Sequence, residues 1–509
     1  MPSTTAGSKQ NLGGPAPIGR SSIPLVEHHS VSLSASDRTR VDAIAARLIA
    51  DEPAFQSTDA FGPRVGPGML EGPAVLIGDH REIALATPAV AETYEYRLAV
   101  LAARGDIILM SGNRNPVFEN YLQAYLDIGA IDVIELPQKG RDGRKPLAQR
   151  CQTDKCALDS IVAKARRGAG LTIIPHIGTG SAWTLAGLVS DLAGVPVRVA
   201  APPPRLTRRV NDKLWFARRV ADLLERPAHP PFRSAYGPAA LAAQMARLAG
   251  RSERVVVKVP DSAGSSGNVC LMAKDVEKQS LTELRNNLLS ILRGLGWRDR
   301  FPLLVEIWDS DVLANPSVQT WIPSTGDGDP IIEGIFEQIV EGAEGKFVGS
   351  VAAALPDLWE RAIVGEAFRL AMLFQRLGYF GRCSFDAVIA GESYAQADLH
   401  WIECNGRWGG VSIPMTLANR LTGDWQRHPF VVVQRAHLAM KAREFVQILE
   451  TLDDDLFRVA QDLHGVVLLS PLGFEQGTAI NLMAISDSVE AAKDLAGRST
   501  RALKNEVRH

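Results

Sequence analysis

The chain has 509 residues, enough for about three domains of ordinary size. Hydrophobic residues make up 46% and charged residues 22%, and the formal net charge is −2, which excludes a disordered chain and a protein held on nucleic acid by bulk positive charge. No apolar run approaches the ~20 residues of a membrane-spanning helix. Five cysteines exclude a disulfide scaffold and fit a reducing cytosol. We therefore expect a cytoplasmic enzyme with no nucleic-acid or membrane partner.

Residues 1–40 are rich in Ser, Thr, Gly and Pro and lack both a sustained apolar period and the apolar core of a secretory signal. Such a composition cannot bury enough apolar surface to offset the entropy of ordering. We predict a disordered tail.

Short apolar strands then alternate with amphipathic helices, a pattern that predicts a parallel sheet covered by helices. Three consecutive prolines, at 202–204, mark its end. The expected strands are 107–110, 132–136, 171–175 and 195–200, and the expected helices are 116–129, 157–167 and 182–192.

The following region reads as antiparallel strands with a few helices, and the last segment as a smaller α/β unit. The expected strands are two within 254–272, then 302–308, 317–322, 346–352, 384–389, 400–405, 466–469 and 479–483. The expected helices are 212–224, 281–295, 358–377 and 432–449, with one more at the carboxyl end.

A lysine-bearing strand leads into a loop of small residues. Residues 255–259 are apolar apart from Lys258, and four small residues follow: Gly264, Ser265, Ser266 and Gly267. Glycine and serine let backbone N–H groups approach phosphate oxygens, and a lysine adds a point charge. The pattern indicates a phosphate-binding loop, although a Gly-Ser hairpin in an ordinary sheet gives the same residues.

Another apolar strand ends in Glu306, Ile307 and Trp308. Backbone groups at such a strand end can pair with an adenine edge, and Asp309 or Asp311 can hold a ribose. A strand that runs out into solvent produces the same pattern, so both interpretations stay open.

The most specific pattern lies further along the chain. Glu403 and Asn405 are two residues apart on a predicted strand, so their side chains point to one face, and Asp386 lies on the preceding strand. Three oxygen donors suit Mg²⁺ rather than zinc. Arg407 follows on the same side. The alternative is a surface salt bridge, but burying these polar groups beside the tryptophans of this segment is costly unless they are paired or bind a metal.

Taken in order, these parts resemble the ATP-grasp superfamily over residues 206–425. The specific element is Glu403-x-Asn405-x-Arg407-x-Gly409-Gly410. In addition, Asn211-Asp212-Lys213 at a helix start is similar to the family's first phosphate-contacting lysine. Two features depart from the family pattern: Glu306 is followed by Ile307 instead of a second acid, and Arg382 stands four residues before Asp386 instead of beside it.

The resemblance implies an α/β fold: a Rossmann-like pre-ATP-grasp domain, a two-subdomain ATP-grasp fold with antiparallel sheets, and a C-terminal α/β extension. The expected boundaries are 1–40 for the tail, 41–205 for the pre-ATP-grasp domain, 206–430 for the ATP-grasp domain (206–300 carrying the nucleotide loop, 301–430 the metal site) and 431–509 for the extension.

The activity implied by the resemblance is ATP-dependent ligation, in which a carboxylate is activated as an acyl phosphate and joined to an amine, releasing ADP and phosphate. The domain combination resembles peptide ligases of natural-product biosynthesis, so amino-acid or peptide substrates are expected. A small-molecule kinase of the same superfamily and a nucleotide-binding protein without turnover are the alternatives. ATP and one or two Mg²⁺ are the implied cofactors, with Mn²⁺ as a substitute, and a homodimer stays open.

The resemblance also implies residue roles. The expected metal ligands are Asp386, Glu403 and Asn405. The expected catalytic residues are Arg407, Lys258 and Arg382. The expected nucleotide contacts are Lys213, Lys258, Gly264, Ser265, Ser266, Gly267, Glu306, Ile307, Trp308 and Asp311.

A few other residues carry weaker signals. His176 follows a predicted strand, where sites often lie, but a lone histidine is more often a structural hydrogen-bonding residue. Three tryptophans fit a substrate pocket and a core equally well: Trp321, Trp401 and Trp408.

Overall fold

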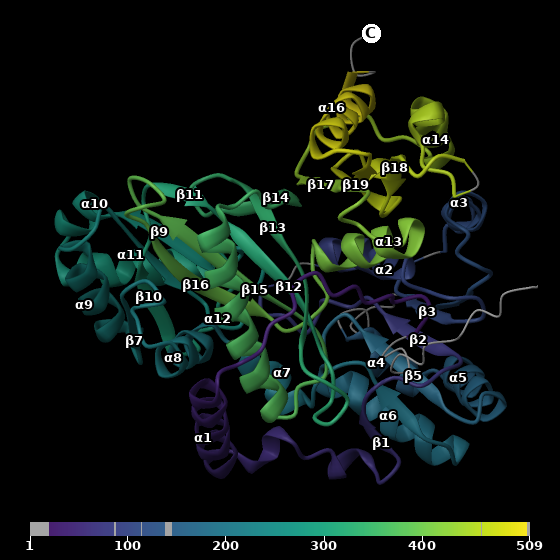
Figure 1. The fold of residues 1–509 in the computed structure, drawn as a ribbon, viewed down its shortest axis with the longest axis horizontal. Coiled ribbons are helices and arrows are strands. Elements are labelled where there is room, and N and C mark those ends of the chain that lie inside the picture. The colour runs from purple at the N-terminus through teal and green to yellow at the C-terminus, as the bar shows by residue number, and fades with distance from the viewer. Residues whose placement is uncertain (1–19, 86–87, 113, 138–144, 460, 506–509) are drawn as a thin grey trace, which may run out of the picture.

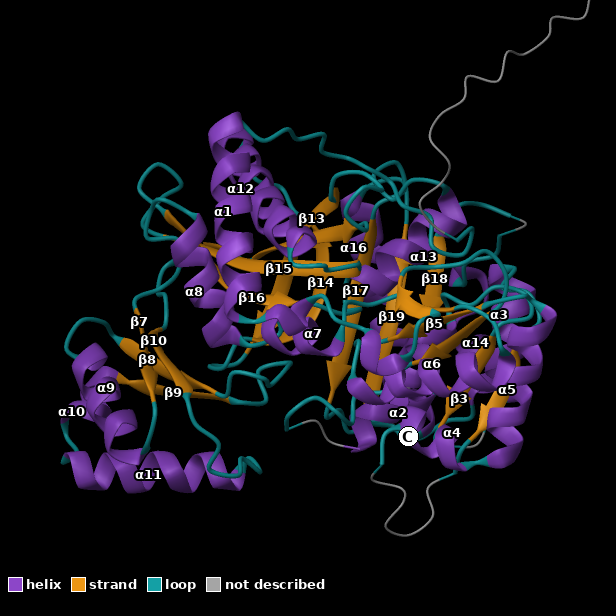
Figure 2. Cartoon of the chain, turned by 90° about the horizontal axis from the view of Figure 1, so that it is seen from below, coloured by secondary structure: helices purple, strands orange, loops and turns teal. Residues whose placement is uncertain are grey.

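The computed structural model describes residues 20–85, 88–112, 114–137, 145–459 and 461–505. These residues form three β-sheets, one parallel and two antiparallel (Figure 1). Seen from below, a small sheet and the parallel sheet lie on opposite sides, with the large sheet between them (Figure 2).

The parallel sheet has the strand order β1-β6-β5-β2-β3-β4, as the alternating pattern predicts. Its central strands are buried, which accounts for their uninterrupted apolar runs. The strands are β1 (Val65–Pro67), β2 (Ala74–Ile77), β3 (Ile107–Met110), β4 (Asp132–Glu135), β5 (Leu171–Pro175) and β6 (Val197–Val199). The helices are α2 (Pro88–Ala99), α3 (Pro116–Leu126), α4 (Leu147–Thr153), α5 (Lys155–Arg167) and α6 (Gly180–Ala193).

The position of β2 beside β5 matters for the site. The two strands are parallel neighbours, so their carboxyl ends meet at one edge of the sheet. His80 follows β2 and His176 follows β5, and the fold therefore brings together two histidines that are far apart in the sequence.

The small antiparallel sheet has the order β7-β10-β8-β9, and helices cover one face of it. It forms the outer end of the molecule, at the left of Figure 1. Its elements are β7 (Phe232–Ala235), β8 (Arg254–Lys258), β9 (Asn268–Met272), β10 (Leu303–Ile307), α9 (Pro238–Ala249), α10 (Ala273–Glu277) and α11 (Leu281–Gly294).

The large antiparallel sheet runs β11-β15-β12-β13-β14-β17-β19-β18, with β16 paired to β15. Helices α1, α8 and α12 share a hydrophobic core with strands β12 and β15. The elements up to residue 422 are α1 (Ala35–Asp51), α7 (Pro204–Val210), α8 (Lys213–Leu223), β11 (Val312–Ala314), β12 (Pro316–Ile322), β13 (Ile331–Glu341), β14 (Lys346–Ala352), α12 (Asp357–Arg376), β15 (Gly381–Ala390), β16 (Asp398–Asn405) and α13 (Ser412–Thr422).

The C-terminal segment is a continuation of this sheet. β17 pairs with β14, and β19 lies between β17 and β18. The predicted helix over 432–449 is wrong in its first half, because the valines at 431–433 are β-branched and pack in a strand. The elements are β17 (Phe430–Ala436), α14 (Phe445–Leu452), β18 (Gly465–Leu468), α15 (Leu472–Glu475), β19 (Ala479–Ile485) and α16 (Val489–Asn505).

Residues 20–40 do not form the predicted tail. Arg20 makes an ion pair with Asp106 at 2.8 Å, Ile23 is fully buried, and His28 contacts Asp424 at 2.9 Å. α1 already begins at Ala35, capped by Ser34. Composition alone missed these contacts because each depends on a residue distant in the sequence. Residues 1–19 lie outside the described residues.

The α/β fold class is confirmed, since a parallel sheet precedes two antiparallel sheets along the chain, but the expected C-terminal unit is not a separate part because its strands extend the large sheet. Among the described helices, none is both long and apolar enough to cross a membrane.

Candidate active site

Two neighbouring strands bring the predicted metal ligands together. Asp386 on β15 lies opposite Glu403 on β16. Asn405 is two residues further along β16, opposite Ser384. The Asn405 Nδ2 donates to Asp386 Oδ2 at 2.8 Å and to Glu403 Oε1 at 3.4 Å. Ser317 Oγ, on β12, donates to the other Asp386 oxygen at 2.6 Å. The period-two alternation that the sequence indicated is what assembles this cluster.

The electrostatics of this cluster fit a cation. Burial and the negative charge of Glu403 raise the pKa of Asp386 to about 7. Burial also opposes the ionisation of Glu403, but Lys213 and Arg407 outweigh it and lower the pKa of that carboxyl. No three His, Cys, Asp or Glu side chains gather as a metal cage within the described ranges. A cation here would be bound by two carboxylates and by the amide oxygen of Asn405, once the amide group has rotated by half a turn. Oxygen donors of this kind suit Mg²⁺.

Two buried lysines flank the carboxylates. Lys213, at the start of α8, places its Nζ 2.9 Å from Glu403 Oε2 and donates to the Ser262 carbonyl at 2.5 Å. The Asp212 carboxylate caps this helix by accepting a hydrogen bond from the Trp215 N–H at 2.9 Å. This cap fixes Lys213 as the first residue of the helix. Lys258, at the end of β8, makes a buried ion pair with Glu306 of β10.

The small-residue loop after β8 closes over the same region. Gly264 and Ser265 both have left-handed backbone, with φ of 59° and 61°, and Ser265 Oγ donates to the Gly345 carbonyl at 3.2 Å. Gly267 plays a different part: a Cβ there would collide with Ser262, so this glycine allows the loop to fold back on itself.

The end of β10 agrees only partly with the predicted nucleotide hinge. The Ile307 and Trp308 N–H groups are already bonded, to the carbonyls of Pro231 and Arg254 at 3.1 Å each. An adenine would therefore find the Trp308 ring and backbone carbonyls rather than free donors. Asp311 is exposed and does not line the cavity; Asp309 does, held at 2.9 Å by His400.

A first cavity extends from this strand end to the Asp386–Glu403 cluster. Its volume is about 250 Å³. One end is apolar and aromatic, and the other carries both lysines and both carboxylates. Predicted residues that line it are Lys213, Lys258, Ser265, Glu306, Ile307, Trp308, Asp386 and Glu403.

The second cavity, of about 340 Å³, lies on the other side of the carboxylates. Asp386 and Glu403 line both cavities, and Asn405 and Arg407 line this one together with Gly264 and Ser266. Most of the remaining wall has no motif in the sequence, because its residues come from separate parts of the chain. That wall includes His80, Tyr94, Gln319, Gln338, Phe347, Gln434 and His437. Of these parts only the position of His176 after a strand gave a signal, and His176 does line the cavity.

The two predicted catalytic arginines have different surroundings. Arg407 is partly exposed in the second cavity and donates to Asn211 Oδ1 at 2.5 Å. Arg382 is buried away from both cavities, where it makes an ion pair with Glu333 and lies between the rings of Trp321 and Trp408, at 5.3 and 5.0 Å. Burial lowers the pKa of Arg382 to about 9. Arg382 lines neither cavity, and its catalytic role stays a prediction.

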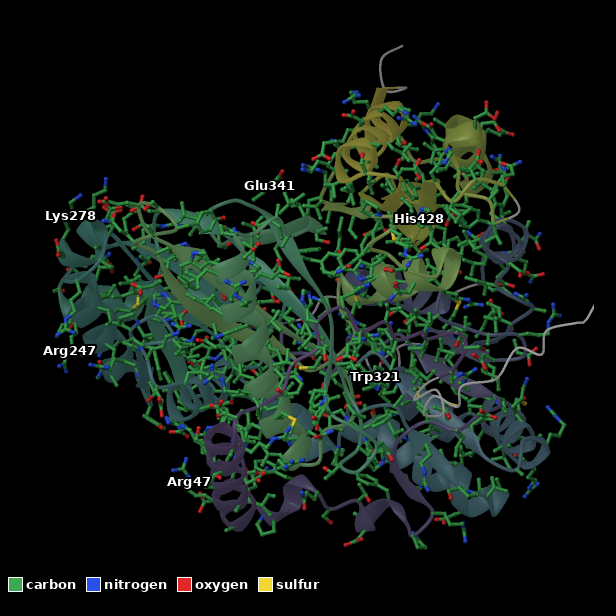
Figure 3. The ribbon with its side chains drawn as sticks, in the orientation of Figure 1. Arg47, Arg247, Lys278, Trp321, Glu341 and His428 are labelled. Atoms are coloured by element: carbon green, nitrogen blue, oxygen red, sulfur yellow. The ribbon has the colours of Figure 1, made fainter. Side chains whose placement is uncertain are left out.

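The tryptophans divide in the same way. Trp408 lines the second cavity, whereas Trp321 and Trp401 are core residues. Figure 3 shows Trp321 in the middle of the molecule, while Arg247 and Lys278 lie at its outer edge.

Comparison with known proteins agrees with this geometry. Residues 95–190 match the family model of the Pre ATP-grasp domain. The fold is similar to that of an N5-carboxyaminoimidazole ribonucleotide synthetase in complex with ADP (12% identity, 86% of this chain and 98% of the other, TM-score 0.50). It is also similar to the biotin carboxylase domain of a 2-oxoglutarate carboxylase from Hydrogenobacter thermophilus (12%, 84% and 89%, 0.50). A third likeness is to carboxyaminoimidazole ribonucleotide synthase from Aspergillus clavatus with ATP (12%, 86% and 99%, 0.50).

No curated protein matches the chain by sequence. At identities this low the likenesses show the fold alone. The chain therefore carries a segment, residues 95–190, that matches the Pre ATP-grasp domain, and its overall fold is similar to that of these structures.

Proposed function

We propose that the protein is an ATP-dependent ligase that activates the carboxylate of an amino acid or peptide as an acyl phosphate and joins it to an amine. The observation that carries the proposal is that Asp386 and Glu403 line both cavities. A nucleotide in the first cavity and a carboxylate in the second would meet at these two side chains.

The first cavity offers the groups that a triphosphate needs. Lys213 and Lys258 bring two positive charges to one end, and Ser265 of the loop lies beside them. A Mg²⁺ held by Asp386, Glu403 and Asn405 would neutralise negative charge on the phosphates while the γ-phosphoryl group is transferred. The loop separates the reacting atoms from water, which would otherwise hydrolyse an acyl phosphate.

Arg407 supports the second half of the reaction. In the first half, an oxygen of the substrate carboxylate attacks the γ-phosphorus and ADP leaves. In the second, the free amine attacks the acyl carbon, the C–O bond to phosphate breaks, and the amine nitrogen loses a proton. Arg407 donates to the neutral Asn211 side chain, and its charge also acts on Asp386 and Glu403, so it supplies positive charge beside these carboxylates, where the oxyanion would form.

The test is hydroxylamine trapping. The protein is given Mg-ATP, hydroxylamine and a panel of amino acids and short peptides, and ADP and hydroxamates are measured. A ligase releases both. Bicarbonate belongs in the panel, scored by ADP release alone, because the similar 2-oxoglutarate carboxylase structure is a complex with ADP and bicarbonate. A stable phosphorylated product without hydroxamate would make the protein a kinase, and AMP with pyrophosphate would contradict the acyl-phosphate route.

A further inference from the structure

One wall of the second cavity consists of polar aromatic side chains from the parallel-sheet domain. The His80 ring is stacked on Tyr94 with centroids 3.7 Å apart, and it meets the His176 ring at 3.8 Å. His80 and His176 are 8% and 1% exposed. Among the described residues, neither nitrogen of His176, nor Nε2 of His80, has a hydrogen-bond partner. Buried polar groups are ordinarily paired, so this wall has unmet hydrogen-bonding capacity just behind the cavity surface.

The charge behind this wall is also unbalanced. Arg97 is fully buried over the Tyr94 ring, 4.8 Å from its centroid, and donates only to neutral oxygens, Gln434 Oε1 at 2.7 Å and the Gly410 carbonyl at 3.3 Å. Arg407 lines the cavity itself; it donates to Asn211, and its charge also acts on Asp386 and Glu403. Arg97 has no acidic partner in the part of the chain that the structure describes. A buried cation without a counter-ion is costly, and an incoming anion removes that cost.

The histidines do not add charge of their own. Burial lowers the pKa of both, and the positive charges of Arg407 and Arg97 lower it further, with Arg81 also acting on His80. Arg81 itself is neutralised by Asp79 and Glu95. Neutral imidazoles each keep one N–H to donate, so the wall presents donors within a positive field.

We propose that this wall binds an oxyanion, a carboxylate or a phosphate, carried by the amine-bearing substrate. The proposal rests on the ligase function proposed above and names the class of its acceptor: an amine that carries its own acidic group. The carboxylate to be activated belongs at Asp386 and Glu403, where the nucleotide arrives, so the wall is left for a second anion. The same positive field disfavours an ammonium ion and favours the free amine, which is the form that attacks.

The test measures binding, so it does not depend on turnover. The full chain with Mg-ADP is titrated by calorimetry with the common amino acids, with their carboxamides, and with phosphoethanolamine paired with ethanolamine. We expect at least one oxyanion to bind at least tenfold more tightly than its uncharged counterpart. Preference for the amino acid or for phosphoethanolamine then identifies the oxyanion as carboxylate or phosphate.

Variants locate the site. His176→Phe keeps an aromatic ring at this position but removes both nitrogens, and we expect it to abolish the tenfold preference. Arg97→Gln should have the same effect. His464→Phe, an exposed histidine elsewhere, is the control. If His176→Phe does not fold, His80→Phe takes its place in the experiment. The comparison of each oxyanion with its uncharged counterpart is made on the unaltered protein and needs no variant.

Two outcomes would overturn the proposal: no oxyanion binding more tightly than its uncharged counterpart, or a preference unchanged in the variants. Neither result bears on hydroxamate formation, which tests the ligase function separately. Conversely, a protein that binds the oxyanion but forms no hydroxamate would keep this subsite and lose the ligase function.

Discussion

The two cavities share a wall but differ in how they are built. The first is lined only by residues between 213 and 403, mostly on strands or loops next to the predicted motifs. The second draws on three regions: the parallel-sheet domain, residues 263–411 of the two antiparallel sheets, and the C-terminal segment. The first cavity is thus encoded in local pattern, whereas the second exists only once distant segments have packed.

The largest effect should follow from changing a residue that both cavities share. Glu403→Gln keeps the shape and removes a charge, so ADP release should fall about 10²–10³-fold. Thermal melting should stay close to that of the unaltered protein. Near-normal ADP release from a folded variant would show that the shared wall is not the reaction centre. Glu337→Gln, on β13, is a matched control outside both cavities.

Next in size is an effect on stability rather than activity. Arg382→Met leaves Glu333 buried without its partner, which should cost about 3–5 kcal/mol of unfolding free energy. Urea unfolding measures this. Arg382→Met combined with Glu333→Leu should recover much of the loss. If the single variant is fully stable but inactive, Arg382 acts in the reaction after all.

A smaller effect on the reaction, at the first cavity, is expected for Lys258→Ala, which also leaves Glu306 buried without its partner and should lower the unfolding free energy as Arg382→Met does. A charge-assisted contact to phosphate is worth about 1.5–3 kcal/mol, so ATP affinity should fall roughly 10- to 100-fold. The exposed Lys274→Ala is the control. Calorimetry that gives the two variants equal affinities would remove Lys258 from the phosphate site.

The smallest expected change concerns the loop between the cavities. Ser265 lines one cavity and Gly264 and Ser266 the other, so bound Mg-ATP should slow amide exchange at residues 264–267. Hydrogen-exchange mass spectrometry reports this. Exchange unchanged by Mg-ATP would contradict a closing role for the loop.

The sequence predicted the cluster of Asp386, Glu403 and Asn405 because alternation along strands is a local rule. The prediction for Arg382 rests on the family resemblance instead of on this rule. Arg382 lies on the same face as Asp386, but four residues along a strand span about 13 Å, and Trp321 on β12, opposite Arg382, helps to enclose it. Distance along an element has to be weighed as well as the face.

The second cavity could not be predicted in this way. His80 and Tyr94 have no motif around them, and Gln434 lies in a segment predicted as a helix. Their meeting depends on the parallel neighbours β2 and β5 and on the pairing of β17 with β14. Unmet hydrogen bonds and unpaired charge identify such residues only after the fold is known.

The pairing of β14 with β17 also constrains how the protein is made. About 80 residues separate the end of β14 from the start of β17, so at about 5–20 residues per second the edge of β14 has no partner for several seconds of synthesis and can pair with another chain. Gln434 and His437 complete the second cavity only after that pairing. A nascent chain can therefore build the first cavity seconds before it completes the second, and a chaperone that covers this edge would act most during that interval.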